Sequence, residues 1–254
     1  MDLETLTKTP IILIPAYEPD DSLIKTTTAL RQESFPVVVV DDGSGPQFQE
    51  IFAQLAPEIS LLHHQENLGK GSALKTGLDF IKKYFQNFIV ITADADGQQQ
   101  ISDIKRMATT YRQHLHTILL GVRQFNSQKV PFRCRFGNNL TRKIYALITK
   151  QDVSDTQTGL RAFDDSLADF MLTIPGSRFE YEMNVLLSAS RAHLPIVELP
   201  IATIYLNNNQ SSHFNPVKDS LNIYRQVLKF ASSSLLSFAL DLGIFSLLVY
   251  LTSS

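Results

Sequence analysis

In Phe88-Ile89-Val90-Ile91-Thr92-Ala93-Asp94-Ala95-Asp96-Gly97-Gln98 an apolar run leads directly into two carboxylates, and this is the most informative pattern of the sequence. A short run that is apolar on both faces is typical of a parallel strand covered by helices. Residues i and i+2 of an extended segment point the same way, so Asp94 and Asp96 are expected to converge. The stretch predicts a buried strand with a pair of acidic side chains at its carboxyl end.

Short apolar runs alternate with helix-like stretches on both sides of this strand. The predicted strands are Ile11–Ile14, Val37–Val40, Ile59–Leu62, Phe88–Thr92 and Thr117–Leu120. The predicted helices are Asp21–Glu33, Phe48–Ala56, Lys70–Gln86 and Ser102–His114. Asp20 or Asp21 is expected to cap the first helix and Ser102 the last, with Asp103 favoured by the helix dipole. The alternation predicts an α/β fold with an open, mostly parallel sheet flanked by helices.

The pattern changes after Val122. A basic loop and a helix are expected over 131–150, a loop with a short strand over 154–163, and a helix over 179–193. The strand expected over 196–205 contains Pro200, which suits a sheet edge or a bulge because proline cannot donate to a strand ladder.

The C-terminal part of the sequence predicts a membrane attachment. Pro216–Lys229 is amphipathic, and Phe230–Leu251 is nearly all apolar or small, long enough to span a bilayer. Preceding Lys and Arg residues place its start on the cytoplasmic side. Asp241 interrupts the span and predicts a partner transmembrane helix or a larger membrane unit. The alternative is a buried C-terminal core helix. We expect a catalytic domain at 1–214, a juxtamembrane helix at 215–229 and a transmembrane segment at 230–254.

The composition limits the other partners. The chain is 44% hydrophobic and 19% charged, as ordinary globular proteins are. A net charge of −2 supplies no basic field for nucleic acid. The single cysteine, Cys134, excludes an internal disulfide and fits a reducing compartment.

Asp94 and Asp96 offer the hard oxygen ligands that Mg²⁺ or Mn²⁺ prefers, in a position to neutralise a diphosphate leaving group. The alternative is an acidic turn that caps the next helix. Asp41-Asp42-Gly43-Ser44 ends another predicted strand, where carboxylates could accept hydrogen bonds from a ribose or a base, or could simply form a turn.

Two further motifs lie at predicted strand or helix ends. In Pro15-Ala16-Tyr17-Glu18 the Tyr17 ring could lie against a base, or could serve only for packing. Asn67-Leu68-Gly69-Lys70-Gly71-Ser72 opens a helix whose N-terminus, with Lys70, favours an anion. The spacing is neither that of a Walker A loop nor that of a dinucleotide-binding G-x-G-x-x-G.

Taken together and in this order, the four motifs resemble family 2 glycosyltransferases of the GT-A fold, in the branch of polyprenyl-phosphate sugar synthases. The resemblance covers roughly 10–214. It extends to Gly121-Val122-Arg123, Arg135-Phe136-Gly137-Asn138, the segment Asp155–Arg161, Glu180-Tyr181-Glu182 and Glu198-Leu199-Pro200. The tail is similar to the start of a small multi-span membrane domain found in bacterial fusions.

This resemblance implies an inverting transfer of sugar from a nucleotide-diphosphate donor, with UDP favoured over GDP, to a polyprenyl phosphate at the cytoplasmic face of the cell membrane. It implies Mg²⁺ or Mn²⁺ as cofactor, held by Asp94, Asp96 and Gln98. The implied donor-binding residues are Pro15, Ala16, Tyr17, Glu18, Asp41, Asp42, Asn67, Lys70, Asp94 and Ala95. The implied acceptor-binding residues are Arg123, Arg135, Gln157 and Arg161, since guanidinium groups match phosphate oxygens. The implied catalytic residues are Asp155, Asp96 and Arg123.

The role of Asp155 depends on the chemical nature of the acceptor. A hydroxyl acceptor requires a base, whereas a phosphate monoester with a second pKa near about 6 is already largely a dianion at neutral pH. Asp155 is therefore base, metal ligand or orienting group, depending on the acceptor.

Three other functions fit parts of the sequence. A nucleotidyltransferase would also use carboxylates and a metal, but it would carry a Gly-rich basic loop after the first strand, where this chain has Pro15–Glu18. A catalytically idle membrane-anchored subunit would not need Asp94, Asp96 and Asp155. A transferase that acts on saccharide hydroxyls in cell-wall or polysaccharide synthesis is disfavoured by the apolar tail and by Gly121-Val122-Arg123.

Overall fold

A twisted seven-stranded sheet with strand order β3-β2-β1-β4-β6-β5-β7 organises the molecule. The computed structural model describes residues 8–123, 142–143, 145–147, 149–202 and 242. The strands are β1 Thr9–Ala16, β2 Val37–Asp41, β3 Ser60–His63, β4 Phe88–Thr92, β5 Ile118–Arg123, β6 Arg161–Asp164 and β7 Ile196–Ile201. The helices are α2 Ser22–Gln32, α3 Gln49–Ala53, α4 Lys70–Tyr84, α5 Ile101–Tyr111, α7 Ala168–Thr173 and α8 Glu180–Arg191, with short 3₁₀ turns at Pro46–Phe48 and Asp165–Leu167.

Strands β3, β2, β1 and β4 run parallel to one another. Their register aligns Ala16 with Asp41, and Leu13 with Thr92. The carboxyl ends of β1, β2 and β4 therefore lie at one edge of the sheet, where open α/β sheets bind their ligands.

Strand β6 is the exception in this pattern. It pairs antiparallel with β4 on one side and with β5 on the other, while β5 and β7 are parallel. The α/β class, the mostly parallel sheet and the short strand within 154–163 are confirmed. Strand β7 lies at the sheet edge, which accommodates Pro200 as predicted.

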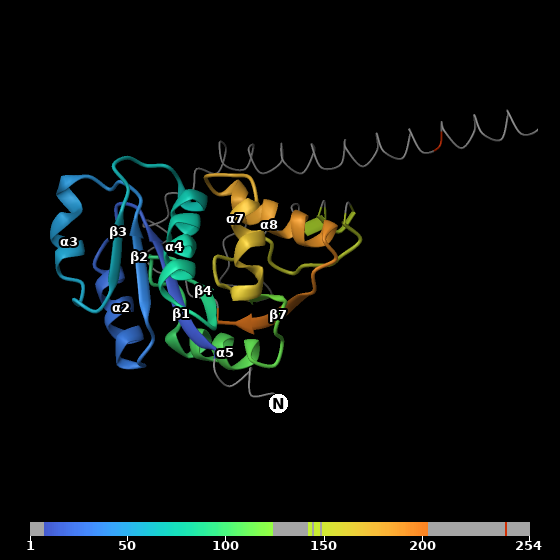
Figure 1. The fold of residues 1–254 in the computed structure, drawn as a ribbon, viewed down its shortest axis with the longest axis horizontal. Coiled ribbons are helices and arrows are strands. Elements are labelled where there is room, and N and C mark those ends of the chain that lie inside the picture. The colour runs from blue at the N-terminus through green and yellow to red at the C-terminus, as the bar shows by residue number, and fades with distance from the viewer. Residues whose placement is uncertain (1–7, 124–141, 144, 148, 203–241, 243–254) are drawn as a thin grey trace, which may run out of the picture.

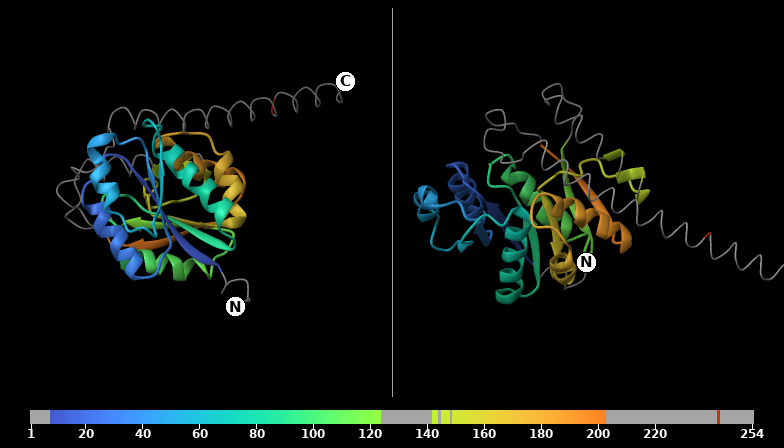
Figure 2. Two further views of the ribbon diagram at one scale, coloured as in Figure 1. Left: turned by 60° about the vertical axis from the view of Figure 1, so that its left-hand side comes forward. Right: turned by 90° about the horizontal axis from the view of Figure 1, so that it is seen from above.

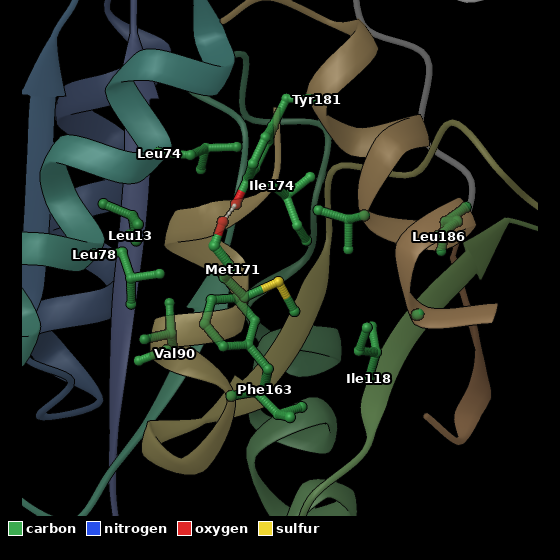
Figure 3. Packing of buried hydrophobic residues seen from close by; sticks show 14 of the residues in the cluster. Leu13, Leu74, Leu78, Val90, Ile118, Phe163, Met171, Ile174, Tyr181 and Leu186 are labelled. Carbon is green, nitrogen blue, oxygen red and sulfur yellow. Dashed lines mark hydrogen bonds between the residues drawn. The ribbon is translucent and has the colours of Figure 1, made fainter. Parts of the chain in front are cut away.

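Helices cover both faces of the sheet (Figures 1 and 2). Successive side chains of β1 alternate between the two cores: Ile11 and Leu13 pack toward α4, α7 and α8, whereas Ile12 and Ile14 pack toward α2 and α5. Figure 3 shows the first core, where the buried Tyr181 of α8 donates a hydrogen bond from its hydroxyl to the Met171 carbonyl at 3.0 Å. This bond satisfies a polar atom inside an apolar layer.

Several local predictions differ from the structure. Helix α5 begins at Ile101 with Gln100 as its N-cap, so the predicted N-cap Ser102 is wrong. Asp21 occupies the N-cap of α2 without a side-chain cap, while the Asp20 carboxylate accepts the amide of Ser22. Helix α7 was not predicted, because its six residues are too few for a periodic pattern.

The predicted juxtamembrane helix and transmembrane segment lie outside the described residues. In the ranges that are described, no helix is long and apolar enough to cross a bilayer.

Candidate functional site

The strand ends bring the first two motifs together. The Asp42 amide donates to the Ala16 carbonyl at 2.8 Å, and the Glu18 amide donates to the Ser44 hydroxyl at 2.8 Å. Pro15, Ala16 and Tyr17 thus lie directly beside Asp41 and Asp42. Burial, followed by the Glu18 and Asp42 carboxylates, raises the pKa of Tyr17. The predicted nucleoside-binding residues share one edge of the sheet.

The Asp42 carboxylate is buried and supports the neighbouring loop. Its oxygens accept the backbone amides of Leu68 at 3.0 Å and Gly69 at 2.7 Å, and one of them lies 2.7 Å from His64 Nδ1. In Gly43, which adopts φ +73°, a Cβ would overlap with the Glu66 backbone, so close packing requires glycine here. Asp42 therefore fixes the loop that leads to Lys70.

Asp41 and Asn67 also have partners inside the site. Asp41 accepts the amide of Ser44 at 2.9 Å and contacts His63 Nδ1 at 3.0 Å. The Asn67 side-chain oxygen accepts Arg178 Nη1 at 2.9 Å. Both side chains thus hold loops at the strand ends.

Lys70 joins this loop to the acidic pair. Its Nζ lies 2.7 Å from Asp94 Oδ1 and 3.0 Å from Glu182 Oε1, and 5.9 Å from the centre of the Phe179 ring. Burial works against the charge of Lys70, but the Asp94 and Glu182 carboxylates outweigh it and raise its pKa. In this structure Lys70 is the counterion of Asp94.

Asp94 is held on both of its oxygens. Lys70 contacts Oδ1, Gln99 Nε2 donates to Oδ2 at 2.8 Å, and the Asp94 amide donates to Gln99 Oε1 at 2.9 Å. Burial raises the pKa of Asp94, but Lys70 and then Gln99 outweigh burial, so the net shift is downward. Asp94 is thereby kept ionised.

The pKa of Asp96 shifts in the opposite direction to that of Asp94. Burial, and then the charge of Asp94, raise its pKa to about 6, although Oδ1 accepts the Gln98 amide at 3.0 Å. Ala95 separates the two carboxylates along the chain. Asp96 lies in a turn and not in an extended segment, so the predicted geometry is wrong, although Asp96 is close enough to Asp94 to feel its charge. A cation would stabilise the ionised form of this pair.

Asp155 and Arg123 form the second half of the site. Asp155 is 0% exposed, and its oxygens accept Arg123 Nε at 2.7 Å and Nη2 at 3.1 Å. The Gln157 amide donates to Asp155 Oδ1 at 3.1 Å. The 155–160 loop then reaches Asp94, because a Cβ on Gly159 would overlap with both Asp94 oxygens. The two predicted halves meet at this contact.

Of the two remaining predicted acceptor residues, the structure describes only Arg161. Arg161 is buried and donates to the carbonyls of Thr158 at 2.9 Å, Glu182 at 2.7 Å and Thr156 at 3.3 Å. Its guanidinium thus braces the loop and α8. Arg135 lies outside the described residues.

Sequence reasoning assigned no role to Glu182, Gln99 or Gly159 in the site. Glu182 lies within a motif that carries the resemblance, and this was the available signal. Gly159 likewise lies within the Asp155–Arg161 segment that carries the resemblance, whereas Gln99, next to Gln98, had no such signal.

The site fits a divalent cation that is shared with a ligand. Among the described residues, no three His, Cys, Asp or Glu side chains are grouped to hold a metal by themselves. Mg²⁺ is commonly bound by one or two carboxylates together with substrate phosphates. Four carboxylates, Asp94, Asp96, Asp155 and Glu182, are accompanied by Lys70 and Arg123 in ion pairs and by the buried Arg161, which donates to the Glu182 carbonyl. When all are ionised, a surplus of negative charge remains for a cation to balance.

Replacing Arg123 by methionine is expected to lower the free energy of unfolding by roughly 2–3 kcal/mol, because it leaves the buried Asp155 carboxylate without its charge partner. Urea unfolding measures this. Arg142 and Asp152 form the matched control: they make the same two-pronged contact but are 40% and 64% exposed, so Arg142→Met should cost less than about 1 kcal/mol. Equal losses in the two variants would show that burial of Asp155 does not matter.

Comparisons with known proteins agree with this geometry. The model of glycosyl transferase family 2 matches residues 11–170. Over 239 residues the chain is 27% identical to a UDP-N-acetylglucosamine–dolichyl-phosphate N-acetylglucosaminyltransferase of Methanococcus voltae, covering 85% of this chain and 94% of the relative. Over 186 residues it is 30% identical to an undecaprenyl-phosphate 4-deoxy-4-formamido-L-arabinose transferase of Photorhabdus laumondii, covering 68% and 54%.

A solved structure gives the same picture of the fold. Mannosyl-3-phosphoglycerate synthase from Rubrobacter xylanophilus superposes with a TM-score of 0.62 at 13% identity, covering 92% of this chain and 76% of that one. This likeness shows a GT-A-like sheet. The matched segment takes in β1 to β6 and both halves of the site. The chain therefore belongs to glycosyl transferase family 2.

Proposed function

We propose that this protein is an inverting glycosyltransferase that moves a sugar from a nucleotide-diphosphate donor to a polyprenyl phosphate at the cytoplasmic face of the cell membrane. The observation that carries the proposal is the contact of Gly159 with Asp94, which joins the acidic pair to the Asp155–Arg123 ion pair. The relatives from Methanococcus voltae and Photorhabdus laumondii, which act on dolichyl and undecaprenyl phosphates, support the acceptor class.

The donor would lie across the ends of β1, β2 and β4. In this proposal Tyr17, Glu18 and Asp42 would bind the nucleoside, and Asp94, Asp96 and Gln98 would bind the diphosphate end. Mg²⁺ or Mn²⁺ held by Asp94 and Asp96 would neutralise the leaving diphosphate. UDP is our preferred nucleotide, on the basis of the resemblance.

The acceptor phosphate would approach from the side of Arg123, which is 30% exposed and whose positive charge would attract phosphate oxygens. Arg135 is a further candidate for this contact. Since a phosphate dianion needs no strong base, we assign Asp155 to orienting Arg123, with Gln157 in the same loop. The sugar carbon would be attacked from the side opposite the diphosphate, which gives inversion.

Asp155→Asn is expected to lower kcat by roughly 10–100-fold through misplacement of Arg123, without a new pH dependence between pH 6 and 8. A pH series of initial rates measures this. If Asp155 were a general base toward a hydroxyl acceptor, the variant would lose still more activity, and the wild-type ascending limb of the pH profile would disappear.

The test of the proposed function uses membranes that contain the full chain, incubated with a panel of labelled nucleotide sugars. Label that becomes extractable into organic solvent, and that is lost with chelator, would support a lipid-phosphate acceptor and a required divalent ion. Label that appears only in water-soluble saccharide would instead support transfer to a hydroxyl group. Because the panel includes UDP- and GDP-sugars, the same experiment identifies the donor.

A further inference from the structure

We propose that Glu182 is a positioning residue that keeps Lys70 paired when a divalent cation takes over Asp94. The inference rests on the cation-binding part of the proposed function. In the structure the Lys70 ammonium contacts both carboxylates, at 2.7 Å from Asp94 and 3.0 Å from Glu182. It thus occupies one of the Asp94 oxygens that the cation would need.

Losing the contact with Asp94 would destabilise the folded protein if Lys70 had no second carboxylate as a partner. Its side chain is only 16% exposed, and a buried ammonium without a counterion is strongly destabilising. Glu182 removes this obstacle because it already contacts Nζ. Lys70 can release Asp94 and remain in an ion pair.

The position of Glu182 relative to Lys70 is fixed by close packing between α4 and α8. A Cβ on Gly71 would lie 2.6 Å from Tyr181 Cβ, and the Ser72 amide donates to the Ser177 carbonyl at 2.9 Å. The Glu182 carbonyl accepts Arg161 Nη1 at 2.7 Å. Glu182 therefore stays within reach of Lys70 whether or not Asp94 is engaged.

Lys70 therefore competes with the cation for Asp94, and Glu182 weakens this competition by offering Lys70 a second carboxylate. Lys70→Met should bind Mn²⁺ more tightly, by about tenfold, because the competing ammonium is gone. Glu182→Gln should bind it about tenfold more weakly, because Asp94 is then the only carboxylate that pairs with Lys70. In the Lys70→Met background, the Glu182→Gln substitution should have little further effect.

The experiment is a Mn²⁺ titration of the full chain in detergent, followed by electron paramagnetic resonance and carried out with a fixed concentration of UDP, which supplies the diphosphate oxygens, and without a sugar donor. Lys75→Met is the control for the lost positive charge, since Lys75 is also on α4 but contacts the Gly176 carbonyl and the Tyr181 ring. Asp79→Asn, an exposed carboxylate on α4, is the control for the lost negative charge. Both controls should bind Mn²⁺ nearly as the wild type does.

The outcomes separate two failures. Absence of Mn²⁺ binding by the wild type, or binding that Asp96→Asn leaves intact, overturns the cation site itself. Binding that Lys70→Met does not tighten, or that Glu182→Gln weakens equally with and without Lys70, overturns the partner exchange alone. Should Glu182→Gln fail to fold, Glu182→Asp replaces it: the shorter side chain keeps the charge but withdraws it from Lys70, so it should also weaken Mn²⁺ binding, and only when Lys70 is present.

Discussion

Asp96→Asn is expected to stabilise the cation-free protein against thermal unfolding while it abolishes sugar transfer. The Asp96 pKa is raised to about 6 in the folded chain by burial and by Asp94, whereas an unfolded aspartate titrates near 3.8. The folded state therefore holds the proton more tightly, and ionising Asp96 opposes folding. Allowing for partial exposure, the effect is roughly 1–2 kcal/mol at pH 8.

The sign of this effect predicts its pH dependence. Destabilisation by Asp96 is fully present above pH 6, declines as the pH falls through about 6, and is gone below 3.8, where both states are protonated. The advantage of Asp96→Asn should therefore be largest at pH 8 and should shrink toward pH 4. Thermal unfolding in chelator at several pH values measures this.

The activity of the same variant should fall at least about 100-fold, because an amide cannot neutralise or hold a divalent ion as a carboxylate does. Asp79→Asn, which changes an exposed carboxylate on α4, should alter neither property. A lower melting temperature for Asp96→Asn than for the wild type at pH 8 would contradict the raised pKa of Asp96.

Gly159→Ala is expected to abolish most of the activity. It should lower the free energy of unfolding by less than a substitution in the apolar core would. The added methyl group would overlap with the Asp94 carboxylate, and the loop cannot retreat freely because Thr92 Oγ1 donates to the Gly159 carbonyl at 2.7 Å. Asp94 would have to rotate away from Lys70 and Gln99. We expect a loss of roughly 100-fold in kcat and weaker Mn²⁺ binding, since misplacement of about 1 Å has such effects.

Gly77→Ala is the matched control for this prediction. Its Cβ would overlap with Leu13 and approach Val40 in the core between α4 and the sheet, and the atoms nearest to it include no carboxylate. This variant should lose stability by about 1–3 kcal/mol and keep its activity per folded molecule. If the two variants lost activity to the same degree, the effect of Gly159→Ala would be one of folding and not of Asp94 placement.

Features that depend on neighbouring residues could be predicted from the sequence, whereas contacts between distant segments could not. The strands around Asp42 and Asp94 were predictable because each apolar run ends in polar residues, and parallel strands share one edge for their carboxyl ends. The direction of β6 was not predictable, since strand pairing across the gap from Thr92 to Arg161 has no local signal.

The same contrast holds within the site. The acidic pair and Asp155 were identified from motifs, but the motif around Lys70 indicated an anion site, whereas the structure pairs Lys70 with Asp94 and Glu182. The motif around Arg161 indicated a contact with the acceptor phosphate, whereas the buried guanidinium donates to backbone carbonyls. The partners Asp94 and Glu182 of Lys70, and the Glu182 carbonyl bound by Arg161, come from segments distant in the sequence, so a pattern within a few residues does not contain them.

The antiparallel insertion of β6 between β4 and β5 has a consequence for engineering and for descent. The strand that precedes the acidic pair, β4, and the strand that follows the Asp155 loop, β6, are hydrogen-bonded neighbours, so exchanging one without the other would open the middle of the sheet. Chimeras that combine the donor preference of one relative with the acceptor preference of another would need crossovers outside residues 88–164. Recombination within that block should yield insoluble protein more often than hybrid specificity.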